Sequence, residues 1–346
     1  MTRRIRDDKA TVSFLSGGLD SRCGVGALRS RNVQVHSFNF ARPGTQDQIF
    51  GSDFAQQIGT IHQVCPKEPG DQVPDYSSLL GRAWNTVRHE LKDPVERPSL
   101  AWSGEGGSVS LGHVHLTKSI CDLMRGGKVD AAIEEFFRRE HVYVSPKLFK
   151  SEVFAGVINE GIKTELIGLR NVDPARNFYL FLMLNDQRRK LSAHFENIDL
   201  HRVEYQLPFF DSGVLSQVMA VPIELCLGHR FYTKWLGYFA SAVRSVPWQV
   251  YPDHEPCPLP MPLGLDYQWA EKYQTAERTS QRQQLIEQAS VLLRMADFPD
   301  EILRKRNLRL ATWIHATGWR DYEHIIKAAQ TYLTYWKTCE GVYDLP

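Results

Sequence analysis

The chain has 346 residues, with 41 Lys and Arg against 40 Asp and Glu, so its formal net charge is +1. This balance offers neither a basic stripe for nucleic acid nor an acidic tail, and no apolar run approaches the ~18 residues of a membrane helix. The six cysteines are scattered without a Cys-x-x-Cys pair. That spacing argues against a zinc site and predicts reduced thiols in the cytoplasm.

Strand and helix signals alternate along the N-terminal part of the chain. Short β-branched and apolar runs predict strands over residues 12–15, 33–40 and 59–64, and helical spacing predicts helices over 22–31 and 47–58. Strand–helix–strand units of this length imply right-handed crossovers and a parallel sheet. The expected fold class is therefore α/β, with a doubly wound parallel sheet.

The loop between the first strand and the first helix has the sequence SGGLDS, residues 16–21. Its glycines, Gly17 and Gly18, allow backbone N–H groups to gather around phosphate oxygens, and the helix N-terminus adds the positive end of its dipole. The hydroxyls of Ser16 and Ser21 add hydrogen-bond donors. Because a carboxylate repels phosphate, we expect Asp20 to hold a Mg²⁺ ion that bridges the phosphates.

Two better-known phosphate loops do not fit these residues. No Gly-Lys-Ser/Thr follows, as a Walker-type loop requires, and there is no Gly-x-Gly-x-x-Gly dinucleotide fingerprint. The loop instead resembles the pyrophosphate-binding loop of ATP pyrophosphatases, which cleave ATP between the α and β phosphates. The simpler alternative is a tight turn capped by Ser16 or Asp20.

The second half of the sequence has mainly helical signals, interrupted by a proline-rich segment. Six of the 18 prolines lie between positions 247 and 262, which predicts an extended arm. We therefore expect an ATP pyrophosphatase domain at 1–246, an arm at 247–264 and an appended helical region at 265–346. The expected helices cover residues 131–139, 147–169, 178–190, 281–295 and 321–339. In the last of them the apolar stripe Ile325, Ala329, Leu333 and Trp336 favours core packing over a ligand groove.

Later segments repeat the motif order of one family. They are Ser37 and Phe38 at the end of the second strand, the segment GTIH at 59–62, SGEG at 103–106, and VEYQLPFFD at 203–211, followed by Lys234. In this order the chain resembles the synthetase domain of asparagine synthetases and their relatives, the β-lactam synthetases and lasso-peptide cyclases. The resemblance extends over roughly residues 10 to 240.

The resemblance implies a reaction and its cofactors, ATP and Mg²⁺. A substrate carboxylate attacks the α-phosphate, pyrophosphate leaves, and ammonia or an amine then attacks the acyl-adenylate and expels AMP. Lys234 would meet the leaving pyrophosphate and Glu105 would take the proton of the attacking amine, while Phe38 and Gly104 would contact the nucleotide. The alternative for Lys234 is an ordinary surface lysine, and the alternative for Glu105 is a solvated or helix-capping carboxylate.

Some residues depart from the family pattern. Ser108 stands where the family has a second Mg²⁺-binding aspartate, so Asp47 or Glu105 would have to compensate. Gln206 replaces an arginine. His113 and His115 could share one face of a strand and bind a metal, but packing or phosphate hydrogen bonds are the simpler interpretation.

The sequence leaves the acceptor open. Only nine residues precede the β-branched and apolar run that begins at Ala10, so the glutaminase domain of asparagine synthetases is not expected here. The nitrogen would come from free ammonia, from a separate glutaminase subunit, or from an amine, including one within the substrate. Two rival functions remain: an ATP pyrophosphatase that activates an RNA base for thiolation, which the neutral charge disfavours, and a nucleotide-binding protein or regulatory subunit without turnover.

Overall fold

The computed structural model describes residues 10–65, 99–140, 147–150, 153–188, 191, 203–267 and 271–338. The chain divides into two compact units, one of residues 1–122 with 171–270 and one of residues 123–170 with 271–346. These units differ from the three segments expected from the sequence. Residues 123–170 group with the C-terminal helices, and the proline-rich residues 247–264 belong to the first unit.

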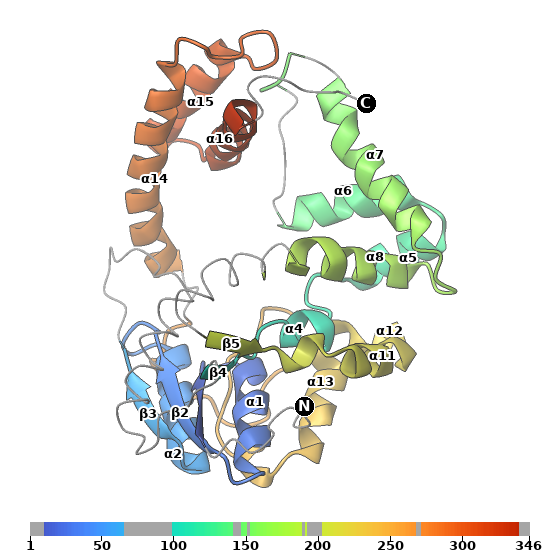
Figure 1. The fold of residues 1–346 in the computed structure, drawn as a ribbon, viewed down its shortest axis with the longest axis vertical. Helices are drawn as coiled ribbons and strands as arrows, with labels where there is room; N and C mark the ends of the chain where they lie inside the picture. The colour runs from blue at the N-terminus through green and yellow to red at the C-terminus, as the bar shows by residue number, and fades with distance from the viewer. Residues whose placement is uncertain are drawn as a thin grey trace. The chain divides into compact units, whose positions relative to one another are not determined.

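The first unit is built on a five-stranded parallel sheet in the order β3-β2-β1-β4-β5 (Figure 1). Its strands are β1 (Ala10–Phe14), β2 (Gln34–Asn39), β3 (Ile61–Val64), β4 (Ser99–Trp102) and β5 (Val203–Gln206). The chain moves outward from β1 to β3 and then returns to the other side of β1. This reversal confirms the doubly wound α/β fold and makes the carboxyl ends of β1 and β4 the switch point, where such sheets bind ligands.

The first crossover helices are α1 (Leu19–Arg29) and α2 (Gln46–Ile58), which contact each other. The Thr45 hydroxyl accepts the N–H of Gln48 at the start of α2, and Gly59, at φ 73°, ends the helix in the left-handed conformation that glycine adopts without strain. Strand β1 is buried from Thr11 to Phe14. Its continuous burial, rather than an alternation of buried and exposed positions, is typical of a strand covered on both faces.

Short helices complete this unit after β4 and β5. They are α4 (Gly107–Ser110), α5 (Lys118–Arg125, which ends just beyond the unit), α8 (Ala175–Phe181) with a π-helical turn at Leu182–Gln187, α11 (Ser212–Ala220), α12 (Ile223–Cys226) and α13 (Arg230–Trp235). Single 3-10 turns lie at Pro208–Phe210, Leu227–His229, Leu236–Tyr238 and Ser241–Arg244. Asp211, the last residue of the VEYQLPFFD motif, accepts the N–H groups of Gly213 and Val214 and therefore caps α11.

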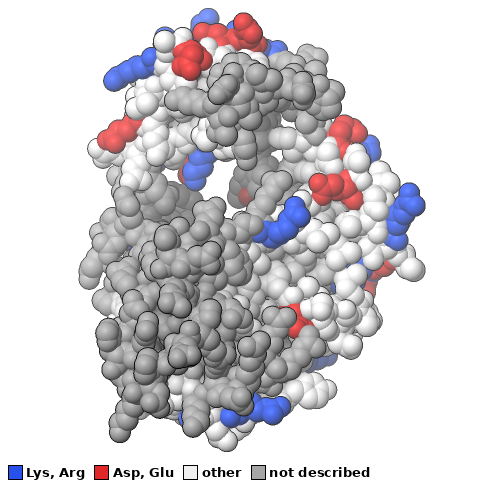
Figure 2. Space-filling view, in the orientation of Figure 1, with Lys and Arg blue, Asp and Glu red and all other residues white. Residues whose placement is uncertain are grey.

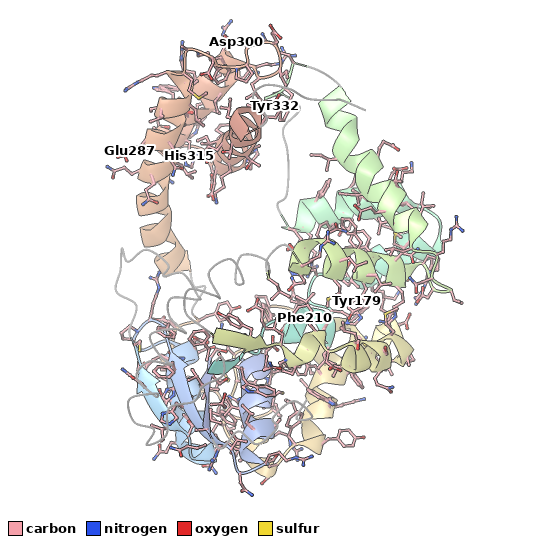
Figure 3. The ribbon with its side chains drawn as sticks, in the orientation of Figure 1. Tyr179, Phe210, Glu287, Asp300, His315 and Tyr332 are labelled. Carbon is pink, nitrogen blue, oxygen red and sulfur yellow. The ribbon has the colours of Figure 1, made fainter. Side chains whose placement is uncertain are left out.

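The second unit contains α6 (Val129–Glu140), α7 (Val153–Gly168), α14 (Glu271–Leu293), α15 (Lys305–Thr317) and α16 (Glu323–Thr338). Leu148 and Phe149 join a buried cluster with residues of the last three helices, among them Ile325, Ala329 and Leu333. The predicted stripe on α16 is thus core at these three positions, while the side chain of Trp336 lies outside the described residues. Tyr332, labelled in Figure 3, packs edge-on against Phe149 with ring centroids 6.0 Å apart.

On the face drawn in Figure 2, the described Lys and Arg side chains lie interspersed with Asp and Glu rather than gathered by sign. Across the described part of the chain, none of the helices combines the length and the apolar character needed to span a bilayer.

Candidate active site

The loop after β1 is closed by its own hydroxyls and by α2. The Ser16 N–H donates to Ser21 Oγ at 2.9 Å, and the Gly18 N–H donates to Ser16 Oγ at 3.2 Å. The Gly17 N–H donates to Asp47 Oδ1 at 2.8 Å. Gly18 caps α1 without a side-chain hydrogen bond, so the α1 N-terminus keeps backbone donors for an anion.

Asp20 is held by two residues from distant parts of the sequence. The Ser108 N–H and hydroxyl donate to its two carboxylate oxygens at 2.8 and 3.0 Å, and the Tyr232 hydroxyl donates to Oδ1 at 2.7 Å. Desolvation, opposed by these hydrogen bonds, raises the pKa of Asp20 to about 6. Ser108, the departure from the family pattern, therefore orients the carboxylate that the sequence assigns to Mg²⁺.

The loops after β1 and β4 interlock through glycines. A Cβ at Gly104 would lie 2.2 Å from the Ser21 nitrogen, and one at Gly107 would lie 2.6 Å from Asp20 Cγ. Gly106 has φ +83°, and a Cβ there would meet the Phe210 ring at 2.2 Å (Phe210 is labelled in Figure 3). The SGEG motif thus works as a spacer that brings Glu105 and Ser108 against the first loop.

We expect Gly104→Ala to destabilise the protein by about 1–3 kcal/mol, because the new methyl group meets rigid backbone. Gly24→Ala in α1 is the matched control, since a Cβ there meets nothing within 4 Å. It should leave stability unchanged or raise it by up to ~1 kcal/mol. Urea unfolding of the two variants compares them directly, and equal stabilities would refute the interlock.

Two cavities open on the Asp20 loop within the first unit. The Glu105 cavity, about 280 Å³, is lined by residues that include Ser16, Asp20, Ser21, Gly104 and Glu105. The Trp248 cavity, about 110 Å³, is lined by residues that include Ser16, Gly18, Asp20, Asp47 and Trp248. Ser16, Asp20, Ser108 and Tyr251 line both cavities, so a ligand on the loop could reach into either one.

A buried arginine fixes the wall of the Trp248 cavity. Arg22 donates to the carbonyls of Val246 at 2.5 Å and Pro247 at 2.7 Å, and its guanidinium lies 4.8 Å from the centre of the Phe54 ring. The Gln249 N–H then donates to Gly17 O at 2.9 Å. Residues of the proline-rich segment, which has turns but no helix or strand in the described structure, therefore form part of the site.

Most of the predicted site residues meet around this loop. Ser16, Gly18, Asp20, Ser21, Gly104 and Glu105 line at least one cavity, and Gly17 contacts its neighbours through both backbone groups. Phe38 does not line either cavity: it is buried in β2, and its carbonyl accepts the Leu15 N–H at 2.9 Å. Asp47 lines the Trp248 cavity and Glu105 lines the Glu105 cavity, so the two carboxylates suggested as substitutes for the family aspartate line different cavities.

Lys234 is not brought to the loop. It is exposed on α13 and lines neither cavity, whereas Tyr232 of the same helix reaches Asp20. We therefore expect Lys234→Ala to change ATP binding by no more than about twofold, as for an ordinary surface residue. Calorimetry with ATP and Mg²⁺ tests this, with Tyr232→Phe as the comparison that does disturb the site. A loss on the order of 10²-fold would restore the role that the family resemblance implies.

The two histidines of the His-Val-His segment do not lie on a strand. His113 and His115 follow α4 in a turn, where His113 has φ 49°. His113 stacks on Tyr179 with ring centroids 4.3 Å apart, and its Nε2 lies 3.0 Å from Arg176 Nη1 (Tyr179 is labelled in Figure 3). Burial and Arg176 lower the pKa of His113 to about 3. Packing is the interpretation that fits these contacts.

The residues fit a bound cation at Asp20. Its carboxylate is largely enclosed, and no Lys or Arg is among the described residues that line the two cavities. The described ranges contain no cluster of three metal-binding side chains. A Mg²⁺ ion would therefore complete its coordination with phosphate oxygens and water, as Mg²⁺ commonly does.

Several residues of the site were missed from the sequence. Tyr232, His229, Trp248, Tyr251 and Tyr267 all contact the loop region or line its cavities. The available signal was an unusual density of aromatic residues before and within the proline-rich segment. Their meeting with Asp20 depends on contacts across about two hundred residues, which periodicity does not report.

The sheet order and the loop at its switch point are consistent with a doubly wound α/β fold of the ATP pyrophosphatase type. Residues 1–88 match the family model described as asparagine synthase. This match supports a synthetase domain of the asparagine synthetase family, whose members are ATP-dependent and form amides. No curated protein matches the chain.

Proposed function

We propose that the protein is an AMP-forming amide synthetase that adenylates a carboxylic acid and transfers the acyl group to ammonia or an amine. The observation that carries the proposal is the interlocked pair of loops after β1 and β4. These loops bring the α1 N-terminus, Asp20 and Glu105 to two cavities that share four lining residues, Ser16, Asp20, Ser108 and Tyr251. The family match of residues 1–88 supports the ATP-dependent part of the proposal.

Each residue has a role in this proposal. The α1 N-terminal amides and the Ser16 and Ser21 hydroxyls bind phosphate oxygens, where negative charge grows as pyrophosphate leaves. Asp20, oriented by Ser108 and Tyr232, would hold Mg²⁺, which when bound neutralises charge on the phosphates. Glu105 accepts the proton that the attacking nitrogen must lose.

The proposed reaction has two steps. A carboxylate oxygen forms a bond to the α-phosphorus, and the bond to the β-phosphate oxygen breaks with its electron pair leaving on pyrophosphate. The nitrogen lone pair then attacks the acyl carbon, and the carbon–oxygen bond to AMP breaks. The net products are an amide, AMP and pyrophosphate.

A screen of carboxylic acids for ATP consumption tests the proposal. The correct acid and amine should convert ATP to AMP and pyrophosphate in equal amounts, measured by separating the nucleotides chromatographically. Formation of ADP would contradict the mechanism, because it requires attack at the γ-phosphate.

One observation favours a second candidate, a nucleotide-binding protein without turnover. Among the described residues that line the two cavities there is no lysine or arginine to stabilise a leaving pyrophosphate. For this candidate, ATP with Mg²⁺ would bind in calorimetry while no acid and amine pair released pyrophosphate.

A further inference from the structure

Gln187 reaches the Glu105 cavity from a part of the fold that supplies neither of the two interlocked loops. It is the last residue of the π-helical turn Leu182–Gln187, and it lines this cavity together with Glu105. The turn and the loops belong to the same compact unit. Single π-helical turns occur frequently at functional sites, so the residue that this turn brings to the cavity is a candidate for ligand binding.

The side chain of Gln187 is buried but only partly hydrogen-bonded. Gln187 is 2% exposed, and its Nε2 donates to Asp186 Oδ2 at 2.7 Å. Within the described part of the chain, this is the one hydrogen bond that the side chain makes. A glutamine amide has a second N–H and a carbonyl oxygen, and buried amides are ordinarily satisfied. The wall of the cavity therefore has hydrogen-bonding capacity that the described residues do not use.

Asp186 determines which atom of the amide is left for a ligand. An ionised carboxylate only accepts hydrogen bonds, so it holds the nitrogen of Gln187 and leaves Oε1 as the unused acceptor. A neutral N–H or O–H group is the partner that this oxygen requires. Because Gln187 is uncharged, this contact adds no charge beside the phosphates that the proposed function assigns to the loop after β1.

The cavity has room for more than the reacting carboxylate. Its volume of about 280 Å³ corresponds to roughly 20–30 water positions at 10–15 Å³ each. Phe14 and Val109 add apolar surface to the lining. The lining therefore suits an acid with several carbon atoms and one neutral hydrogen-bond donor.

We propose that Gln187 selects the acid substrate by accepting, at Oε1, a hydrogen bond from a neutral N–H or O–H group of that acid. The inference rests on the proposed function, which puts the acyl group beside Glu105 in this cavity. An acid without the donor displaces water from the buried carbonyl oxygen and leaves it unpaired, which weakens binding by about 5–100-fold. Gln187 contacts the bound acid and takes no part in proton transfer.

Pairs of acids that differ in one group test the inference. N-acetylglycine carries an amide N–H, which acetoxyacetate replaces by an ester oxygen. Glycolate carries a hydroxyl, which fluoroacetate replaces by fluorine. Calorimetry measures the binding of each acid in the presence of Mg²⁺ and α,β-methylene-ATP, which blocks the release of pyrophosphate. We expect the donor-bearing acid of one pair to bind about 5–100-fold more tightly than its partner, and that pair identifies the donor as amide or hydroxyl.

Gln187→Met keeps the length of the side chain and removes both of its hydrogen-bonding atoms. In this variant the preference should fall to within about twofold, while ATP binding without acid should change by no more than about twofold. Gln217→Met is the matched control, because Gln217 is an exposed glutamine of α11 that lines neither cavity. The comparison of paired acids on the wild-type protein needs no variant, so it stands even where Gln187→Met does not fold.

Equal binding of the two acids in both pairs would overturn the inference, and so would a preference that Gln187→Met retains. A loss of ATP binding in Gln187→Met without acid would also overturn it, since the ribose hydroxyls of the nucleotide would then be the donors. Acid-dependent exchange of pyrophosphate into ATP separates the two proposals. Exchange that is equally fast with both acids of each pair overturns the role of Gln187 alone. Donor-dependent binding without exchange for any acid supports the acid site at Gln187 and overturns the proposed function.

Discussion

Replacing Asp20 by asparagine is expected to stabilise the protein above pH 7 while removing most of its affinity for ATP with Mg²⁺. The pKa of Asp20 is raised from 3.8 to about 6, so the folded state holds this proton more tightly than the unfolded chain. The stabilisation that protonated Asp20 contributes to the folded state is therefore fully present below pH ~4, and it is lost as the pH rises through about 6. A pKa shift of this size corresponds to a loss of up to ~3 kcal/mol in the free energy of unfolding when Asp20 ionises at higher pH. Asparagine does not ionise, so the variant avoids this loss.

The contacts of Asp20 permit the substitution. An asparagine oxygen can accept the Ser108 N–H, and its amide can donate to the Ser108 and Tyr232 hydroxyls, which both accept as well as donate. Thermal unfolding at pH 4 and pH 8 measures the effect, with Asp53→Asn on the exposed side of α2 as the control. A variant that is less stable than the wild type at pH 8 would contradict the argument. AMP binding should fall less than ATP binding, because AMP lacks the phosphates that a metal bridges.

Glu105→Gln is expected to slow amide formation by about 10²–10⁴-fold, the usual contribution of a positioned general base. Adenylation itself requires no proton transfer to Glu105. The variant should therefore still exchange labelled pyrophosphate into ATP in the presence of the acid, within a few-fold of the wild-type rate. Glutamine keeps the shape of the side chain, so the lining of the Glu105 cavity changes little.

The rate of pyrophosphate exchange and the rate of amide formation of Glu105→Gln serve as controls for each other. Parallel loss of exchange and amide formation would assign Glu105 to nucleotide binding or folding instead. Full amide formation would leave it as a solvated carboxylate, the alternative that the sequence already offered.

The N-terminal half of the sheet could be predicted because its signals are local. Strands β1 to β3 and helices α1 and α2 each match a predicted segment to within a few residues. Strands β4 and β5 were not predicted as strands, since each is only four residues long and is specified by pairing with distant strands. Helix α15 was also missed, although its buried residues Leu308, Ala311 and His315 have helical spacing.

The residues of the candidate site likewise divide into those that local sequence predicts and those that depend on contacts with distant segments. The order of residues 16–21 predicts a phosphate loop, and the resemblance of SGEG to a family motif adds Glu105, so Asp20 and Glu105 could both be proposed as site residues. The sequence could reveal that Ser108 departs from the family, but not that its hydroxyl and N–H hold Asp20. Nor could it reveal that Tyr232, rather than Lys234, faces the loop, because this depends on the angle at which α13 crosses the site.

Oxygen transfer from the acid to AMP tests the central claim most directly. The acid is supplied with ¹⁸O in both carboxylate oxygens, and the nucleotide product is analysed by mass spectrometry after turnover with an amine. If the carboxylate attacks the α-phosphate, one ¹⁸O atom appears in each AMP and the other remains in the amide. AMP without ¹⁸O, or label in inorganic phosphate accompanied by ADP, would contradict acyl-adenylation at the Asp20 loop.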